Sequence, residues 1–526
     1  MAPELSALPN DIDELKQKVV SLYLQIDGLK ETILLLQRLH FGPKSEQGPV
    51  PGQSELFDQE GAIEEVRTVS PEEAASYRIP VRSHNRRAPG RKPLPKDLPA
   101  IEILHDVPEA ERVCCKRPMN RIGEERLEQL GVIPPQFYRV VHVRPKYGCG
   151  VCDGENTEGA VIKVAPAPEQ LIPKSIVTPE LLSWVLTAKC VDGLPFYRLE
   201  KMLHRYGVEI SRETMCMWMQ QGASRLLPLV GLLREEILRS EVIQADETTV
   251  QVLREPGRSA TSKSYLWVYR GGDSGHPVLC FEYHPSRGAE VPLKFLNGYQ
   301  GVLQTDGYEG YTEVGKQPGI VHATSMAHAR RKFVEAAKVA KVKGLADYAL
   351  REFFRPLYAI EAEARELKLG PEARLKLRTE QAKPILEGFK SWLDEKVLQT
   401  PPSLRLGKAI GYARKLWPKL TRYAEDGRIE IDTNLLENAI RPFCVGRRAW
   451  LFHDSPEGAK ASAVLHGLIQ TAKAAGLEPY HYLRFVFTKL LTMKPDDEFA
   501  ALLPHRLRPQ DIVLPPLQLP TPDPGG

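Results

Sequence analysis

The chain has 526 residues, too many for one hydrophobic core of ordinary size, so we expect several modules with at least one sizeable globular domain. Lysine and arginine exceed aspartate and glutamate by only four, so the net charge alone does not indicate nucleic acid and the placement of the basic residues matters more. The eight cysteines are too sparse for a disulfide framework and favour a reducing compartment.

No segment approaches the roughly 18–20 apolar residues of a membrane span, and the first residues carry acids where a signal peptide would be apolar. These observations argue against the membrane and secreted classes. We therefore expect a soluble cytoplasmic protein without a membrane partner.

Residues 12–36 carry apolar side chains at alternating spacings of three and four, which is the seam of a coiled coil. The seam consists of Ile12, Leu15, Val19, Leu22, Ile26, Leu29, Ile33 and Leu36. Its β-branched positions favour a parallel two-stranded coil, so residues 1–42 predict a leucine zipper that makes a homodimer or a higher oligomer. The alternative is a single amphipathic helix docked on its own protein.

Residues 43–100 are rich in Pro, Gly, Ser, Glu and Arg and lack periodicity, which is typical of a disordered linker. Within it, RSHNRRAPGRKPLPK at 82–96 is strongly basic. A flexible basic arm of this kind can follow a phosphate backbone or enter a minor groove, and the alternative is a solvated linker.

Residues 101–172 contain two cysteine pairs. Cys149 and Cys152 form a CxxC knuckle, and Cys114 with Cys115 would supply the opposite pair of a tetrahedral Zn²⁺ site. Adjacent cysteines rarely both reach one metal, so His105 is an alternative ligand. The sequence predicts a zinc-finger-like module and leaves open whether zinc is bound.

Residues 173–235 predict helices at 178–190, 194–207 and 211–223, with Ser211 as an N-cap. A helix, a short turn containing Gly and a second helix form the pattern of a helix-turn-helix, which presents its second helix to a major groove of DNA. The alternative is an ordinary helical hairpin. The basic flank favours DNA: Arg198, Lys201, Arg205 and Arg212.

Residues 236–480 change to an alternating pattern. Strands are predicted at 242–253, 264–271 and 277–284, a short helix at 288–298, a strand from 301 that ends in a turn at Asp306-Gly307, a strand at 319–325 and a basic helix at 326–342. Three consecutive strands followed by alternating units is the order of the ribonuclease-H-like fold, so we expect an α/β domain with a mixed sheet and helices on its faces.

Two acids mark neighbouring strands of this expected sheet. Asp246 lies in the first strand and Asp306 closes the fourth, so their carboxylates are expected to converge. Glu247 should point to the opposite face, because side chains alternate along a strand. Taken singly, Asp306 has an alternative role as a turn residue and Asp246 as a buried hydrogen-bonding residue.

A third acid is predicted on a short helix in IDTNLLENAIRPF. With Thr433 as cap, Asn434, Glu437 and Arg441 share one face, while Leu436 and Ile440 line another, and Pro442 should end or kink the helix. Its alternative is a surface pair of Glu437 with Arg441. Residues 341–430 would be a helical insertion before this element. Three carboxylates suit two Mg²⁺ ions about 4 Å apart, with Mn²⁺ as the alternative ion.

Basic residues surround the expected acids. His328, Arg330 and Arg331 follow the fifth strand, and Arg441, Arg447 and Arg448 follow Glu437. These basic residues suit a negatively charged substrate, so we expect them to hold phosphates and His328 to position a water or a phosphate.

The chain resembles the transposases of the insertion-sequence-66 family, a group of bacterial DDE transposases. The motifs that carry the resemblance are ADETTV at 245–250, DGYEGY at 306–311, AHARRKF at 327–333 and the NxxExxIRPxxxGRRxWLF pattern at 434–452. Further matches are PGRKPLP in the linker, RPKYGC at 144–149 and LPFYRLEKML at 194–203. The likeness runs over almost the whole chain.

The resemblance implies cleavage at the ends of a mobile element and joining of the 3′-hydroxyls to target DNA, with Asp246, Asp306 and Glu437 as the metal-binding triad. It also implies a zinc-finger-like domain, a helix-turn-helix and a leucine zipper ahead of the catalytic domain, small accessory proteins of the same element, and a place on the nucleoid. The alternatives are a DNA-binding regulator that no longer cuts and a ribonuclease-H-like nuclease.

The chain departs from the family pattern at three places. Ser325 and Met326 stand where the family has a cysteine and a tryptophan, Cys114 and Cys115 are compressed into neighbours, and Asn438 replaces an arginine after Glu437. The triad itself is intact, so an active enzyme is expected. Residues 481–526 form a C-terminal segment whose part from 503 onward is expected to be a disordered Pro-rich tail.

Overall fold

The computed structural model describes residues 102, 113–114, 117–118, 129–130, 135–148, 162–273, 275–339, 344–494 and 498–514. The chain divides into two compact units, of which the smaller spans 59–164, and the described residues from 165 onward belong to the larger. The heptad seam at 12–36, the basic arm at 82–96 and Cys115, Cys149 and Cys152 lie outside the described residues. Predictions for those segments stay predictions.

In the smaller unit the described residues form two antiparallel hairpins. Strand β1 (Val113–Cys114) pairs with β2 (Arg117–Pro118), and β3 (Lys146–Gly148) pairs with β4 (Ile162–Val164). Cys114 is thus the last residue of a strand, and Cys149 directly follows another. The ligand set of the zinc site stays a prediction.

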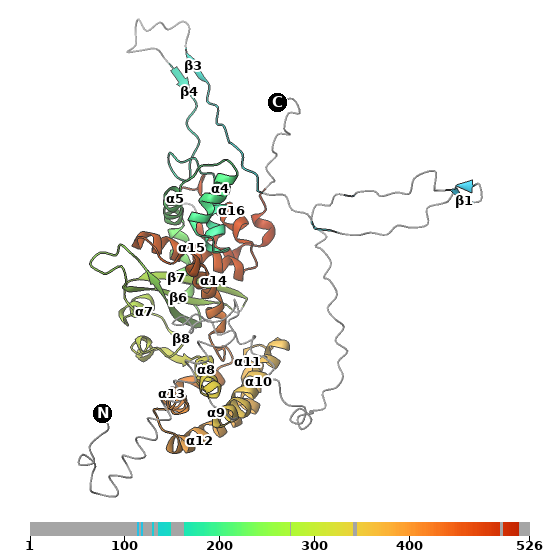
Figure 1. The fold of residues 1–526 in the computed structure, drawn as a ribbon. Helices are drawn as coiled ribbons and strands as arrows, with labels where there is room; N and C mark the ends of the chain where they lie inside the picture. Colours follow the sequence, from blue (N-terminus) through green and yellow to red (C-terminus); the bar gives the residue numbers. More distant parts are fainter. Residues whose placement is uncertain are drawn as a thin grey trace, which may run out of the picture. The chain divides into compact units, whose positions relative to one another are not determined.

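The larger unit contains a five-stranded mixed sheet (Figure 1). Its strands are β5 (Val242–Gln251), β6 (Lys263–Asp273), β7 (His276–His284), β8 (Gly301–Thr305) and β9 (Ile320–Thr324). The spatial order is β7-β6-β5-β8-β9, with β5, β6 and β7 antiparallel and β5, β8 and β9 parallel. All five predicted strands are therefore present, in an α/β arrangement.

The connections between strands agree with the prediction except in one place. Helix α7 (Glu290–Phe295) joins β7 to β8, and α8 (Met326–Val339) follows β9. Between β8 and β9, where alternation predicted a helix, the chain makes two short 3₁₀ turns, η3 (Glu309–Tyr311) and η4 (Val314–Lys316). This segment is rich in Gly and ends at Pro318-Gly319, which favours turns over an α-helix.

One face of the sheet is covered by α14 (Asn434–Trp450) and α15 (Pro456–Ala474). Val250, Leu266 and Val268 of the sheet pack with Leu436 and Ile440 of α14 in one core cluster. Helix α15 is apolar nearly all round, and it is buried between β7 on one side and the helices before the sheet on the other. It therefore connects the sheet to those helices.

The helices before the sheet are α3 (Pro179–Cys190), α4 (Phe196–Arg205), α5 (Arg212–Arg225) and α6 (Leu227–Leu238). As predicted, Ser211 caps α5, its hydroxyl accepting from the Thr214 backbone N–H at 3.2 Å. Glu200 of α4 accepts from the Arg212 backbone N–H at 3.1 Å, so the two helices are fixed at the turn. Met215 and Trp218 of α5 are buried, whereas Met217 is exposed.

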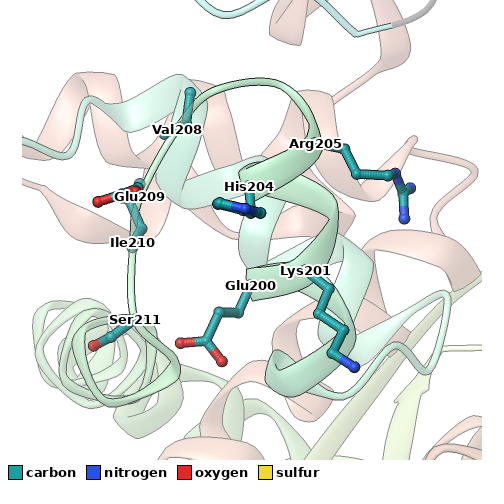
Figure 2. A pocket seen from close by; sticks show the side chains of 8 residues that line it. All are labelled: Glu200, Lys201, His204, Arg205, Val208, Glu209, Ile210 and Ser211. Atoms are coloured by element: carbon teal, nitrogen blue, oxygen red, sulfur yellow. The ribbon is translucent and has the colours of Figure 1, made fainter.

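A groove of about 760 Å³ lies between α4 and the loop that leads to α5. Figure 2 shows it with its lining side chains: Glu200, Lys201, His204, Arg205, Val208, Glu209, Ile210 and Ser211. Two helices joined by a short turn are thus present, and the assignment of a helix-turn-helix domain stays a prediction. DNA binding by this element stays a proposal.

The described part of the predicted insertion is mostly helical. It contains α9 (Leu345–Ala349), α10 (Arg355–Glu366), α11 (Pro371–Leu377), α12 (Lys383–Gln399) and α13 (Arg405–Leu420), with π turns η5 (Leu350–Phe354) and η6 (Arg378–Ala382). Its core is aromatic and includes Phe333 of α8, so the insertion packs directly on the helix that follows β9.

The C-terminal segment differs from its prediction. After α16 (Pro479–Leu490), residues 499–512 form three 3₁₀ turns, η8 (Phe499–Leu502), η9 (Pro504–Arg506) and η10 (Pro509–Ile512). Disorder from residue 503 was therefore the wrong expectation for 503–514, because Leu503 and Ile512 are buried and Arg506 bonds to Glu236. In the described residues, no helix combines the length and apolarity needed to cross a membrane.

Candidate active site

The register of β5 and β8 brings two carboxylates to one level of the sheet. Gln244 pairs with Gln304, and Asp246 and Asp306 each lie two residues further along these parallel neighbours. The Gln244 and Gln304 side chains are hydrogen-bonded to each other, so they share a face. By strand alternation Asp246 lies on that face, and Asp306 lies where β8 has just ended.

Asp246 is almost fully buried among other acids. Burial raises its pKa well above the ordinary value, and the charges of Asp306, Glu247 and Glu437 raise this pKa further. One side-chain oxygen, Oδ1, accepts from the Glu247 backbone N–H at 2.8 Å. The structure therefore brings Asp306 and Glu437 within electrostatic reach of Asp246.

The segment before α14 is fixed to the sheet by buried amides. Gln244 Nε2 donates to the Asp432 carbonyl at 3.2 Å, and Gln304 Nε2 donates to the Glu430 carbonyl at 2.7 Å. Ser325 Oγ accepts from the Thr433 backbone N–H at 3.3 Å. Because these bonds fix residues 430–433, they determine where α14 starts and hence where its first turn carries Glu437.

Helix α14 is longer than predicted. Leu436 and Ile440 are buried as expected, but the helix continues through Pro442 to Trp450 instead of ending there. Pro442 costs one backbone hydrogen bond, while Phe443, Cys444 and Gly446 beyond it are buried and hold the helix against the sheet. Thr433 occupies the cap position, yet its hydroxyl contacts the Glu437 carboxylate at 3.4 Å and caps no backbone N–H.

Glu437 is held by two residues of α8. His328 Nε2 donates to Glu437 Oε1 at 3.1 Å, and an Arg331 guanidinium nitrogen lies 3.8 Å from Oε2. Burial raises the pKa of Glu437, but the His328 bond and the Arg331 charge outweigh burial and leave this pKa below its ordinary value. Glu437 is therefore ionised and oriented, whereas Asp246 resists ionisation.

The other predicted basic residues lie in different surroundings. Arg447 Nη1 donates to Thr248 Oγ1 and Thr249 Oγ1, both at 3.2 Å, so this residue connects α14 to β5 just beyond Asp246. Arg330 lies over the Tyr358 ring of the insertion, 5.4 Å from its centroid. Arg448 is exposed on the last turn of α14 and Arg441 is half-buried near its middle. Roles in phosphate binding stay proposals for all four.

Glu247 lies in a separate polar cluster. Arg287 contacts Glu247 Oε1 at 2.6 Å, and Tyr311 donates to Oε2 at 2.9 Å. Burial and the Asp306 charge raise the pKa of Glu247, while Arg287 lowers it. Since Arg287 and Tyr311 satisfy both carboxylate oxygens, Glu247 has structural partners that Asp246 lacks.

The DGYEGY motif connects the two acidic clusters. Asp306 Oδ1 accepts from the Tyr308 backbone N–H at 2.7 Å, and the Arg287 guanidinium stacks 3.9 Å from the Tyr308 ring centroid. Gly307 has a φ of +88°, and a Cβ there would lie 2.7 Å from Leu416 of α13. The motif thus needs Gly at this position for its turn and for the close approach of the insertion.

The residues present fit a divalent cation by their chemistry. In the part of the chain that the structure describes, no three His, Cys, Asp or Glu side chains are already grouped around a metal-sized position. Asp246, Asp306 and Glu437 nevertheless supply carboxylate oxygens, the ligands that Mg²⁺ prefers. The raised pKa of Asp246 shows like charges that a bound cation would neutralise.

Several residues of this site were not predicted: Gln244, Gln304, Arg287, Tyr311 and Tyr412. Tyr412 of α13 donates to the Asp306 carbonyl at 2.8 Å. A signal existed for the two glutamines, since each lies two residues before an acid in a strand and therefore shares its face. The remaining contacts depend on loops and on the insertion, whose packing the local pattern does not encode.

Comparison with known proteins shows which family the chain resembles. A family model described as Transposase IS66 family matches residues 174–461. Other models match around it: the zinc-finger binding domain of transposase IS66 at 113–153, Transposase C of IS166 homeodomain at 28–103 and the IS66 C-terminal element at 467–505. The zinc-finger match includes all four cysteines of the predicted site.

Proteins that are similar to this chain over nearly its whole length occur in Sinorhizobium fredii (strain NBRC 101917 / NGR234). The chain is 32% identical over 525 residues to the uncharacterized protein y4qI, covering 97% of this chain and 94% of the relative. It is 28% identical over 518 residues to the uncharacterized protein y4jD, covering 96% and 98%. Since the first family model alone matches more than half of the sequence, the chain belongs to the IS66 family of transposases.

Proposed function

We propose that the protein binds the ends of a mobile DNA element, cuts a DNA strand there and joins the 3′-hydroxyl to target DNA. The observation that supports this proposal is that the charges of Asp306 and Glu437 act on the buried Asp246. Membership of a transposase family supports the same reaction class. We assign the three acids as the catalytic, metal-binding triad.

The strand order of the sheet supports a ribonuclease-H-like catalytic domain. Three antiparallel strands are followed by two parallel ones, with the first strand central and next to the fourth. In this arrangement acids from the first and fourth strands share the middle of the sheet, and α14 adds an acid from the face that it covers. The sheet thereby supplies a rigid support for a phosphate-cleaving site.

The triad would hold two Mg²⁺ or Mn²⁺ ions, which supply activation of the attacking oxygen and stabilisation of the leaving oxygen. The chain's own residues do the positioning. His328 and Arg331 keep Glu437 ionised and oriented, and Arg447 positions β5 beside the DNA strand that is cut. Arg330, Arg441 and Arg448 would neutralise flanking phosphates.

The remaining modules are proposed to recognise DNA and to assemble the complex. We assign α4 and α5 to binding of the element ends, Cys114, Cys115, Cys149 and Cys152 to a structural Zn²⁺, and the heptad seam at 12–36 to self-association. Small accessory proteins of the same element and a location on the nucleoid complete the proposal. Size measurement of the chain with and without residues 1–42 would test the self-association.

Strand cleavage and joining tests the central reaction. Wild type is incubated with DNA carrying the element ends and Mg²⁺, beside Asp246→Ala, Asp306→Ala and Glu437→Ala. All three variants should bind the DNA and lose both reactions. Activity in all three variants would reject the triad, and DNA binding without cleavage by wild type would favour the non-cutting regulator. Cleavage of RNA–DNA hybrids without end preference would favour the nuclease.

A further inference from the structure

The end of α14 contains a strained turn in the WLF sequence. Leu451 has φ of 67° and ψ of −53°, in the region where residues other than Gly are rare. The Phe452 backbone N–H donates to the Trp450 carbonyl at 2.9 Å, which closes a three-residue γ-turn of the rare, strained kind. Strain of this type persists only where the surrounding structure maintains it, and it concentrates at functional positions.

The turn exposes two large apolar side chains. Leu451 is 62% exposed and Phe452 42% exposed, and both directly follow α14. The two side chains are adjacent in the sequence and together form a small apolar patch at the end of α14.

The residues on both sides hold this turn rigidly. Trp450 packs edge-on against Phe443, with 5.5 Å between ring centroids, and the Lys189 ammonium lies 4.8 Å from a Trp450 ring centroid. His453 donates its backbone N–H to the Gln251 carbonyl at 2.9 Å and accepts from Leu253 at 3.0 Å. The turn is therefore fixed to α14 on one side and to the end of β5 on the other.

The charges around the turn favour an anionic partner. Arg447 and the exposed Arg448 precede it on the last turn of α14. Asp454, the nearest acid after it, is paired with Arg254. Two exposed side chains cover far less than the roughly 1,200 Å² of a stable protein interface, whereas one aromatic side chain is enough to stack on a base.

We propose that Leu451 and Phe452 form an apolar wedge that stacks on an unpaired base of the element-end DNA. The proposal rests on the proposed function and adds the position at which the two DNA strands separate. Leu451 lies fourteen positions after Glu437, which is a rise of roughly 21 Å along the helix axis at 1.5 Å per residue. For a DNA strand that runs along the axis of α14, at about 3.4 Å per base, the unpaired base would lie approximately six nucleotides from the cleaved bond. An apolar wedge of this kind can unstack a base step.

The test places 2-aminopurine, whose fluorescence rises on unstacking, at successive positions around the cleavage point. The full chain carrying Asp246→Asn binds this DNA without cutting it. Fluorescence should rise severalfold at one position near the sixth nucleotide, and adding Phe452→Ala should abolish the rise. Loss of base stacking should also weaken binding by about 5- to 100-fold.

Leu398→Ala serves as the matched control, because Leu398 is 87% exposed on α12, far along the chain from the turn. It should leave the fluorescence signal unchanged. In the chain with the intact triad, a mismatched base pair at the signal position should restore the cleavage that Phe452→Ala loses. A misfolded variant would not regain cleavage in this way.

An unchanged fluorescence rise in Phe452→Ala would overturn the wedge while leaving the proposed function intact. The wedge proposal would also be overturned if Phe452→Ala formed a smaller oligomer in solution than wild type while its fluorescence rise stayed normal. The turn would then bind a second copy of the chain. Failure of wild type to bind end DNA would overturn both proposals.

Discussion

Asp246 and Glu247 are adjacent, acidic and equally buried, yet they have opposite surroundings. Glu247 forms an ion pair with Arg287 and accepts a hydrogen bond from Tyr311, while the like charges of Asp306 and Glu437 act on Asp246. Strand alternation alone predicts that only one of the two belongs to a site, and the partners decide which one. A carboxylate surrounded by like charges is a candidate metal ligand, whereas a paired one is a structural residue.

This difference predicts separate phenotypes for two isosteric substitutions. Asp246→Asn should lose more than about 100-fold in cleavage, because removal even of an outer-shell partner of a metal site costs 10–100-fold. Glu247→Gln should keep most of its cleavage and lose about 1–3 kcal/mol of unfolding free energy. Urea denaturation and a cleavage assay on the same samples measure both. Equal loss of cleavage would show that the site uses Glu247.

The buried, hydrogen-bonded side chains of Gln244 and Gln304 predict that Gln304 positions the start of α14. Gln304→Leu removes the donor to the Glu430 carbonyl and the acceptor for Gln244, so it should cost about 1–3 kcal/mol of stability. Because α14 would shift, the kcat of cleavage should fall while DNA affinity is maintained. Gln304→Glu is the matched comparison, since it keeps the acceptor for Gln244 but loses the donor to Glu430. A normal kcat in Gln304→Leu would refute the positioning role.

At the scale of elements, a buried ion pair stabilises the helical insertion. Arg378 and Glu361 are both fully buried, and two guanidinium nitrogens each donate at 2.8 Å to a carboxylate oxygen. Glu361→Ala should destabilise the insertion by about 3–5 kcal/mol, because it leaves Arg378 charged and buried. Glu352→Ala, which breaks the exposed pair with Arg351, should cost at most about 1 kcal/mol. Thermal unfolding of the two variants compares them directly, and equal melting temperatures would contradict the prediction.

Much of the element order could be predicted, because alternation, caps and Gly-containing turns are local signals. The five strands, the capped helix at Ser211 and the helical insertion follow from such patterns. The length of α14 could not be predicted, since Pro442 normally ends a helix and only tertiary burial of Phe443 and Cys444 continues it. The ordered turns at 504–512 escaped prediction for the same reason, because short Pro-rich turns acquire their order from packing.

The places of three acids in the fold could be predicted, whereas the contacts that support them could not. Asp246, Asp306 and Glu437 follow from strand, strand end and helix positions. Gln304, Ser325 and Tyr412 act through contacts between segments distant in sequence, which no local period encodes.

At the scale of the whole molecule, buried histidines make stability depend on pH. Burial lowers the pKa of His322 to about 4, of His453 to about 3 and of His466 to about 4. Between pH 6.5 and 4 the unfolded chain binds protons at these positions and the folded chain does not, so stability falls as the pH falls through this range. It should change little from these residues above pH 7.

His466→Gln tests the dependence, since it removes one of the titrating groups. The free energy of unfolding of this variant should fall less steeply between pH 6.5 and 4 than that of wild type, whatever its stability at pH 7. Urea titrations at several pH values give both slopes. Parallel slopes would mean that His466 is not neutral and buried in the folded chain.

The central claim, that Asp246, Asp306 and Glu437 together hold divalent metal, is tested most directly by Mn²⁺ titration of the DNA-bound chain, followed by electron paramagnetic resonance. Wild type should take up about two Mn²⁺ per site, and Asp246→Asn and Asp306→Asn should each reduce the number or the affinity, with Glu247→Gln close to wild type. Binding of Mn²⁺ to both aspartate variants as tightly as to wild type would contradict the account.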